Sequence, residues 1–152
     1  MERTAYPRPQ FVRNEWQNLN GLWEFCFDDE NKGLEERWYL ETAEFEMQIQ
    51  VPFAYQCQLS GIADKKKHEI LWYKKSFHVD RTTGERVWLH FGAVDYLAKI
   101  FLNGSMICEH EGGHTPFSVD ITDFLQEGEQ VLVLRVYDPL EDELIPRGKQ
   151  FW

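Results

Sequence analysis

Apolar and polar residues alternate along much of this chain with a period of two. Phe45, Met47, Ile49 and Val51 fall on one face of such a segment, and residues 87–91 repeat the alternation. Successive side chains of a β-strand point to opposite faces of the sheet, whereas a helix repeats every 3.6 residues. The pattern therefore predicts strands that bury one face each.

Turn residues separate the apolar segments. Asn103-Gly104 is the strongest short hairpin signal in the chain, because both residues tolerate the positive φ angles of a tight turn. The last apolar run is broken only by Arg135, which is typical of a strand covered on both faces. The predicted strands are residues 22–27, 45–51, 70–79, 87–91, 96–102, 106–109 and 131–137.

Helical patterns are short. Residues 35–40 can form a turn or two, and Thr122 is expected to cap a single turn through Phe124 and Leu125 that ends at Gly128. About seven to nine strands with turns between them favour an all-β, antiparallel two-sheet sandwich or jelly roll. We expect at most two short helices in it.

Composition restricts the class of protein and its partners. The hydrophobic fraction of 43% is that of a packed globular chain, and 16 Lys and Arg against 26 Asp and Glu give a net charge of -10. Such a surface repels phosphate backbones and anionic lipids, so neither nucleic acid nor a membrane is an expected partner. No apolar stretch approaches the ~20 residues of a membrane span. A soluble protein is predicted.

Three cysteines, Cys26, Cys57 and Cys108, form an odd set without a close pair. A disulfide framework needs an even number, and a zinc site needs paired spacing. We interpret them as reduced, mostly buried thiols. Reduced thiols indicate a reducing compartment, and a cytoplasmic location is therefore predicted.

Carboxylates cluster after the last predicted strand, as Asp138, Glu141, Asp142 and Glu143. Glycoside hydrolysis needs two carboxyl groups that face each other across the sugar, and these usually come from different elements. A cluster within one loop favours a solvated acidic loop, so no catalytic residue is predicted. Asp138 differs because it lies where a buried strand enters a loop, a position that suits a ligand contact.

Other reactive groups show no recognisable site. His110 and His114 flank Glu111-Gly112-Gly113, but the glycines prevent a helix from placing both imidazoles on one face, so no metal site is predicted. The serines lack the Gly-x-Ser-x-Gly elbow of a nucleophile. The glycines form no phosphate-binding loop, and no cofactor is expected.

Aromatic residues are the remaining candidates for ligand binding. Trp and Tyr side chains can stack on the apolar C–H faces of sugar rings. Trp72, Tyr73, Trp88 and Tyr96 are the candidates in this chain. A sandwich core uses the same residue types, so each of them is favoured as a core residue over a sugar platform.

Several short motifs also follow one another in a characteristic order. They are Asn18-Leu19-Asn20-Gly21-Leu22-Trp23-Glu24-Phe25, Val51-Pro52-Phe53, Trp72-Tyr73-Lys74-Lys75-Ser76-Phe77, Leu89-His90-Phe91-Gly92-Ala93-Val94-Asp95, Asn103-Gly104, Glu111-Gly112-Gly113-His114-Thr115-Pro116-Phe117-Ser118-Val119-Asp120-Ile121-Thr122, Asp138-Pro139 and Pro146-Arg147-Gly148-Lys149-Gln150. In this order they resemble the amino-terminal sugar-binding domain of family 2 glycoside hydrolases, the β-galactosidase, β-glucuronidase and β-mannosidase type. The resemblance covers nearly the whole chain, and the ordered combination is specific.

This resemblance implies a jelly-roll sandwich like other galactose-binding domains, here as a single domain over residues 1–152. In the family an immunoglobulin-like domain and a (β/α)8 barrel follow, and two barrel glutamates perform a retaining hydrolysis. Residues 1–152 contain neither domain, so the resemblance implies an accessory part that is inactive alone. In the β-galactosidases the aspartate that ends the last long strand contacts the sugar. Asp138 holds that position, although the loop after it differs from theirs.

Three functions remain open at this point. The first is an accessory domain that helps to bind a β-glycoside together with the remaining domains of the same polypeptide. The second is an independent carbohydrate-binding module, and the third is a purely structural or oligomerisation domain. If the chain is cut from a longer polypeptide, Phe151 and Trp152 should be exposed or packed against a neighbour, because their natural cover lies in later domains.

Overall fold

The structure is a computed structural model that describes residues 15–80, 84–139, 141–142 and 144–145. Within these residues the chain forms eight β-strands and two short 3-10 helices, and it contains no α-helix. The strands are β1 (Gly21–Phe27), β2 (Met47–Val51), β3 (Ile70–His78), β4 (Trp88–Phe91), β5 (Leu97–Leu102), β6 (Ser105–Glu111), β7 (Phe117–Asp120) and β8 (Glu129–Tyr137), and the 3-10 helices are η2 (Gln58–Ser60) and η3 (Thr122–Phe124).

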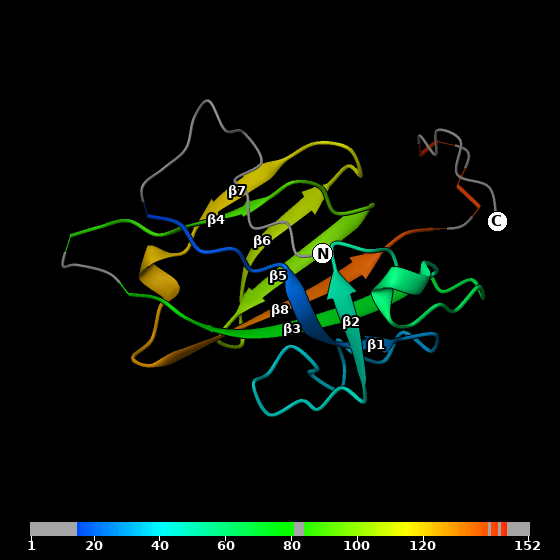
Figure 1. The fold of residues 1–152 in the computed structure, drawn as a ribbon, viewed down its shortest axis with the longest axis horizontal. Coiled ribbons are helices and arrows are strands. Elements are labelled where there is room, and N and C mark those ends of the chain that lie inside the picture. The colour runs from blue at the N-terminus through cyan, green and yellow to red at the C-terminus, as the bar shows by residue number, and fades with distance from the viewer. Residues whose placement is uncertain (1–14, 81–83, 140, 143, 146–152) are drawn as a thin grey trace.

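Two antiparallel sheets make up the fold. The larger sheet has the order β2-β1-β3-β8-β5-β6, and the smaller one pairs β4 with β7. Figure 1 shows β4 and β7 at the β6 side of the large sheet, and the segment between β1 and β2 beyond its opposite side. The predicted all-β, two-sheet sandwich with at most two short helices is confirmed.

The central strand β8 is covered on both faces, as its apolar run predicts. Leu132, Leu134 and Val136 belong to the main core, which also contains Leu89 of β4. The alternate residues point to a second apolar cluster on the outer face of the large sheet, where Val133 packs with other buried side chains. This outer cluster consists of Ile70, Trp72, Phe101, Val131 and Val133, with Cys26, Trp38, Tyr39, Phe45 and Tyr137 packed against it.

The hairpin predicted at Asn103-Gly104 connects β5 to β6. Both residues have positive φ, 51° and 78°, which matches the tight turn that joins two twisted antiparallel strands. The Asn103 amide also donates to Gln130 Oε1 at 2.9 Å and its oxygen accepts from the Val131 N–H at 2.9 Å. The turn is therefore fixed to the beginning of β8.

Residues 35–40 form hydrogen-bonded turns, as their short helical pattern predicts, and no regular helix. The prediction for Thr122 was wrong. Thr122 lies inside η3 and does not cap it, because Ile121 precedes the helix without a side-chain cap. The Thr122 hydroxyl instead accepts from the Val87 N–H at 2.9 Å, a contact between distant segments. The turn also ends at Leu125 and not at Gly128.

The remaining sequence expectations have mixed outcomes. The three cysteines carry free thiols, as predicted, but all three are half-buried instead of mostly buried.

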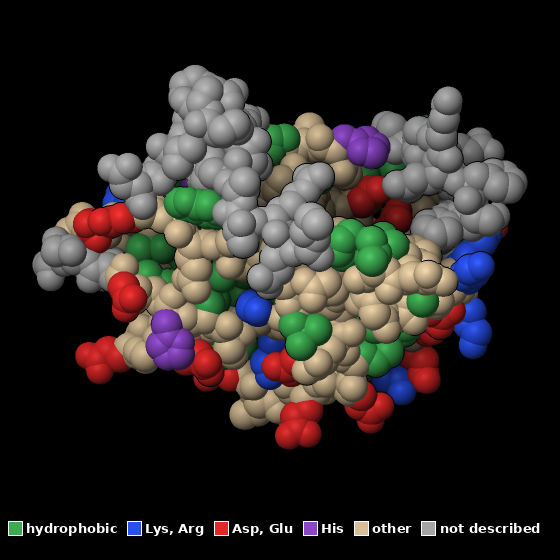
Figure 2. All heavy atoms as spheres, in the orientation of Figure 1, with side chains coloured by type: hydrophobic (Ala, Val, Ile, Leu, Met, Phe, Trp, Pro, Cys, Tyr) green, Lys and Arg blue, Asp and Glu red, His purple; other side chains and the backbone are tan. Residues whose placement is uncertain are grey.

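Acidic side chains are spread over the face drawn in Figure 2 and do not gather in one patch. Phe151 and Trp152 lie outside the described residues. In the described part of the chain, no helix has the length and hydrophobicity that crossing a membrane requires.

Candidate functional site

Asp138 is the first residue after β8, as the sequence places it. Its backbone N–H donates to the Glu69 carbonyl at 2.8 Å, which extends the β3–β8 pairing one step beyond Ile70 and Tyr137. The backbone of Asp138 is therefore held by the sheet. Its half-buried side chain stands where the regular sheet ends.

The direction of the Asp138 side chain follows from the alternation along β8. Val136 points to the main core, so Asp138, two residues later, falls on the same face of the sheet. Electrostatics agree with this placement. Burial is the main cause that raises the pKa of the core residue Tyr55, and the negative charge of Asp138 raises it further. The carboxylate thus lies on the Tyr55 side of the sheet edge.

Tyr96 brings a second set of acidic groups to the same sheet edge. Its backbone N–H donates to the Tyr137 carbonyl at 3.4 Å, and its hydroxyl donates to Glu111 Oε1 at 2.9 Å. This hydrogen bond raises the pKa of Tyr96, and the charges of Asp142 and Asp95 add to the shift. These carboxylates make the edge rich in oxygen acceptors. The peptide bond between Asp95 and Tyr96 at this edge is cis.

The acidic loop after β8 has the open character that the sequence predicts. Glu141 is exposed, and Asp142 accepts a hydrogen bond from the Leu144 N–H at 2.8 Å, which closes a local turn. Glu143 lies outside the described residues. Carboxylates arranged in this way can accept hydrogen bonds from the hydroxyl groups of a polyol.

The four aromatic candidates have different positions. Trp72 is fully buried and its indole N–H donates to Asp28 Oδ2 at 2.9 Å, so it is a core residue. Tyr73 packs edge-on against Phe25 at 5.0 Å, and burial raises its pKa. Trp88 on β4 is 46% exposed, and half-buried Tyr96 lies at the sheet edge. Of the four, only Trp72 is fully buried, and only Trp88 is exposed.

His110 and His114 do not form a site. His110 stacks on Phe117 with the ring centroids 4.0 Å apart, and His114 is exposed in the following turn. Among the residues that the structure describes, no group of three or more His, Cys, Asp or Glu side chains could hold a metal ion.

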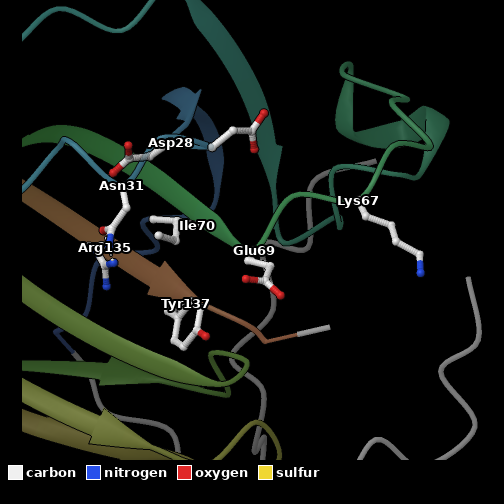
Figure 3. Close-up of a pocket in the computed structure, with 8 residues that line it drawn as sticks. Asp28, Asn31, Lys67, Glu69, Ile70, Arg135 and Tyr137 are labelled. Atoms are coloured by element: carbon white, nitrogen blue, oxygen red, sulfur yellow. Dashed lines mark hydrogen bonds between the residues drawn. The ribbon is translucent and has the colours of Figure 1, made fainter. Parts of the chain in front are cut away.

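A polar pocket lies on the opposite face of the β8 end (Figure 3). It measures about 520 Å³ and is lined by Asp28, Asp29, Asn31, Lys67, Glu69, Ile70, Arg135 and Tyr137. Arg135 Nη2 donates to Asn31 Oδ1 at 2.8 Å. Sequence reasoning missed this pocket, because Asn31 and Arg135 are 104 positions apart. The only sequence signal for the pocket was Arg135, a charged residue within the apolar run of residues 131–137.

The loop that holds Asn31 is organised by the carboxylate of Asp28. Asp28 is 2% exposed, and it accepts hydrogen bonds from the Lys32 N–H at 2.8 Å and the Gly33 N–H at 3.0 Å. A third hydrogen bond to the Asp28 carboxylate comes from the indole N–H of Trp72. One carboxylate therefore ties the loop after β1 to the outer cluster of the large sheet.

Comparison with known proteins places this architecture in a family. Residues 16–152 match the family model described as "Glycosyl hydrolases family 2, sugar binding domain". This chain belongs to that family. The matched residues include Asp138 and the residues that line the pocket around Arg135. The match confirms the resemblance to the family 2 sugar-binding domain that the ordered motifs indicated.

Curated relatives are longer enzymes. A β-glucuronidase of Paenibacillus borealis is 30% identical over 146 residues, which are 95% of this chain and 24% of that protein. A β-galactosidase of Thermoanaerobacter pseudethanolicus is 30% identical over 136 residues, covering 87% of this chain and 16% of that protein. The sugar binding domain described here thus spans about a quarter or less of these relatives.

Solved structures agree with the fold. A β-glucuronidase of Lactobacillus rhamnosus has a TM-score of 0.75 at 30% identity, over 86% of this chain and 23% of that chain. A β-glucuronidase from an uncultured Clostridium sp. has a TM-score of 0.72 at 36% identity, over 86% of this chain and 24% of that chain. The family 2 sugar binding domain is thus supported by both sequence and structure.

Proposed function

We propose that this domain is a non-catalytic part of a family 2 glycoside hydrolase that cleaves β-glucuronides, with β-galactosides as the alternative substrate. The family match carries the proposal, and the β-glucuronidase relatives favour the uronide. Other domains of the same polypeptide would supply the catalytic carboxyl groups. The three free thiols of this domain support a reducing, cytoplasmic location for the enzyme.

Within that enzyme we assign Asp138 to the binding of sugar hydroxyls. Its backbone is fixed by the hydrogen bond to Glu69, so the carboxylate can be held in place without a large entropy loss on binding. The acidic edge around Tyr96 suits hydroxyl donors. The same charge would repel a uronate carboxylate, so this edge should face the hydroxyl-bearing side of the sugar ring.

Kinetics of an Asp138→Ala variant of the full-length enzyme test this assignment. Hydrogen bonds to a charged group are worth about 1.5–3 kcal/mol, so kcat/KM should fall roughly ten- to a hundredfold. Asp80→Ala is the matched control, because Asp80 is an exposed aspartate beyond the opposite end of β3. Equal kcat/KM values for the two variants would show that Asp138 is an ordinary loop residue that does not contact the sugar. Circular dichroism checks that both variants keep the fold.

An independent carbohydrate-binding module is the second candidate function. The observation that favours it is Trp88, which is 46% exposed on β4 and so presents a ring on which a sugar can stack. Titration of this chain with methyl β-D-glucuronide and methyl β-D-galactoside separates the two functions. The accessory role predicts little or no binding by the chain alone. Millimolar or tighter binding that is lost in Trp88→Ala would favour the independent module.

A further inference from the structure

A second pocket lies between strands β1 and β2 and the segment that connects them. It measures about 310 Å³ and is lined by Cys26, Phe27, Trp38, Glu44, Phe45, Glu46 and Met47. Figure 1 shows the connecting segment beyond the β2 side of the large sheet. None of these residues lines the pocket around Arg135 or belongs to the sheet edge around Asp138. The second pocket is therefore a separate site, and we call it the β1–β2 pocket.

Two aromatic rings form part of the wall of the β1–β2 pocket. The Trp38 and Phe45 rings pack edge-on, with their centroids 6.4 Å apart and their planes at 61°. Both residues are half-buried, so part of their surface stays open. Trp38 also packs edge-on against the fully buried Trp72, with the ring centroids 5.9 Å apart. The ring of Trp38 is thus held in place by the outer cluster before any ligand binds.

Glu44 and Glu46 add two negative charges to this pocket. Both residues are exposed, and within the described part of the chain neither side chain makes a hydrogen bond or an ion pair. Lys74 donates to two carbonyl groups of the connecting segment at 2.6 and 3.0 Å and lies 3.7 Å from Glu24, so its charge is already paired. No Lys, Arg or His is among the residues that line the pocket. The pocket therefore carries a negative charge that no described side chain balances.

Aromatic surface beside unpaired carboxylates suits a weakly hydrated organic cation. A cation within about 6 Å of a ring centroid is attracted by the face of the ring, most strongly for Trp. A guanidinium is planar and more weakly hydrated than an ammonium, and its N–H fork fits a carboxylate. A calcium ion takes about six to eight oxygen ligands, more than two glutamates supply. The lining of the pocket therefore favours an arginine side chain.

We propose that the β1–β2 pocket receives the guanidinium of an arginine side chain from another part of the full-length polypeptide. This chain spans 24% of the β-glucuronidase of Paenibacillus borealis, so a polypeptide of that length has most of its residues outside it. Arginine and aromatic residues are enriched where protein surfaces meet, and an arginine seated in a pocket often contributes strongly to binding. The choice of occupant rests on the proposed function, in which this chain is one domain of a larger enzyme.

Titration of this chain with N-acetyl-L-arginine methylamide tests the pocket, with the indole N–H signal of Trp38 in NMR spectra as the readout. The corresponding citrulline compound is the control, because it has almost the same shape and no charge. We expect the arginine probe to shift the signal with saturation, at a dissociation constant of roughly 1–10 mM. The citrulline probe should bind at least about tenfold more weakly, because it lacks the charge that the ring and the glutamates attract. Equal affinities, or no shift with the arginine probe, would show that the proposal is wrong.

Glu44→Gln combined with Glu46→Gln measures the contribution of the two carboxylates. Both side chains are exposed and unpaired in the described structure, so the fold should persist. Affinity for the arginine probe should fall about three- to tenfold. The matched control is Glu127→Gln combined with Glu129→Gln, which removes the same charge from two exposed glutamates at the same spacing, outside the pocket. Equal affinities in the two double variants would contradict the proposal.

NMR spectra of the full-length polypeptide test the occupant. If an arginine of the polypeptide fills the pocket, the Trp38 signal should lie close to its probe-saturated position in the isolated chain, and added probe should not move it. A signal at the position of the unliganded chain that moves with added probe would contradict an occupant from the same polypeptide. Hydrolysis by the chain alone would overturn the proposed function, but it would leave the results of these titrations unchanged.

Discussion

Asp28 is expected to be the most sensitive polar residue of the fold, and Asp28→Asn tests this with almost no change of shape. The carboxylate is 2% exposed. Oδ2 accepts from the Gly33 N–H and the Trp72 indole, and Oδ1 accepts from the Lys32 N–H. An asparagine has only one acceptor oxygen. Its NH2 group must face at least one of these donors and leave it unpaired.

The loss can be estimated from the bonds that the amide cannot make. The most favourable rotamer keeps the oxygen at the Oδ2 position and gives up the bond from Lys32, which measures 2.8 Å. A hydrogen bond to a charged group is worth about 1.5–3 kcal/mol, and the remaining two bonds weaken when the charge is removed. We expect a loss of about 2–3 kcal/mol in the free energy of unfolding. For a domain of this size that is roughly 4–12 °C in Tm.

Urea unfolding at pH 7, followed by far-ultraviolet circular dichroism, measures the effect. Asp29→Asn is the matched control, because it makes the same chemical change at the next residue. The Asp29 side chain is 58% exposed, so loss of its pair with His68 should cost only about 0–1 kcal/mol. If Asp28→Asn were no less stable than Asp29→Asn, Asp28 would not organise the loop as described.

Three further predictions concern other contacts. Gly33→Ala should destabilise the fold by several kcal/mol in the same urea titration, because a Cβ there would lie 2.6 Å from the Trp72 indole. Burial raises the pKa of the Cys26 thiol to about 12, so iodoacetamide at pH 8 should label Cys26 only after unfolding, as mass spectrometry would show. Hydrogen bonds from Thr122 lower the pKa of Asp120 below its ordinary 3.8. The stability that Asp120 provides is therefore present above that pH and lost as the pH falls through the lowered pKa. Asp120→Asn should be less stable than the wild type at pH 7, and the difference should shrink towards pH 2.

The fold was largely predictable because its strands carry strong local signals. The apolar run of β8 and the Asn103-Gly104 turn each determine their own structure with little help from distant residues. β7 was missed as a strand by pattern alone, because Phe117–Asp120 has only two alternating apolar residues, whereas residues 87–91 have three. Thr122 was misread as a cap because its hydroxyl serves Val87, 35 positions earlier.

The site was predictable only where a residue's position in one strand defines its surroundings. Asp138 follows a buried strand, so its place at the sheet edge could be read from the sequence. The pocket around Arg135 depends on a loop that Asp28 folds back onto the sheet, and no spacing in the sequence encodes that contact. Trp72 has the residue type of a sugar platform, but the same loop covers it.

Hydrolysis by this chain alone, compared with the full-length polypeptide, tests the central claim most directly. A retaining glycosidase needs two carboxyl groups about 5–5.5 Å apart, and we assign that pair to the remaining domains. With 4-nitrophenyl β-D-glucuronide and β-D-galactoside, the full polypeptide should release nitrophenol from one of the two. The chain alone should show only the rate of a buffer blank. Turnover by the chain alone that survives repurification would contradict the proposal of a non-catalytic domain.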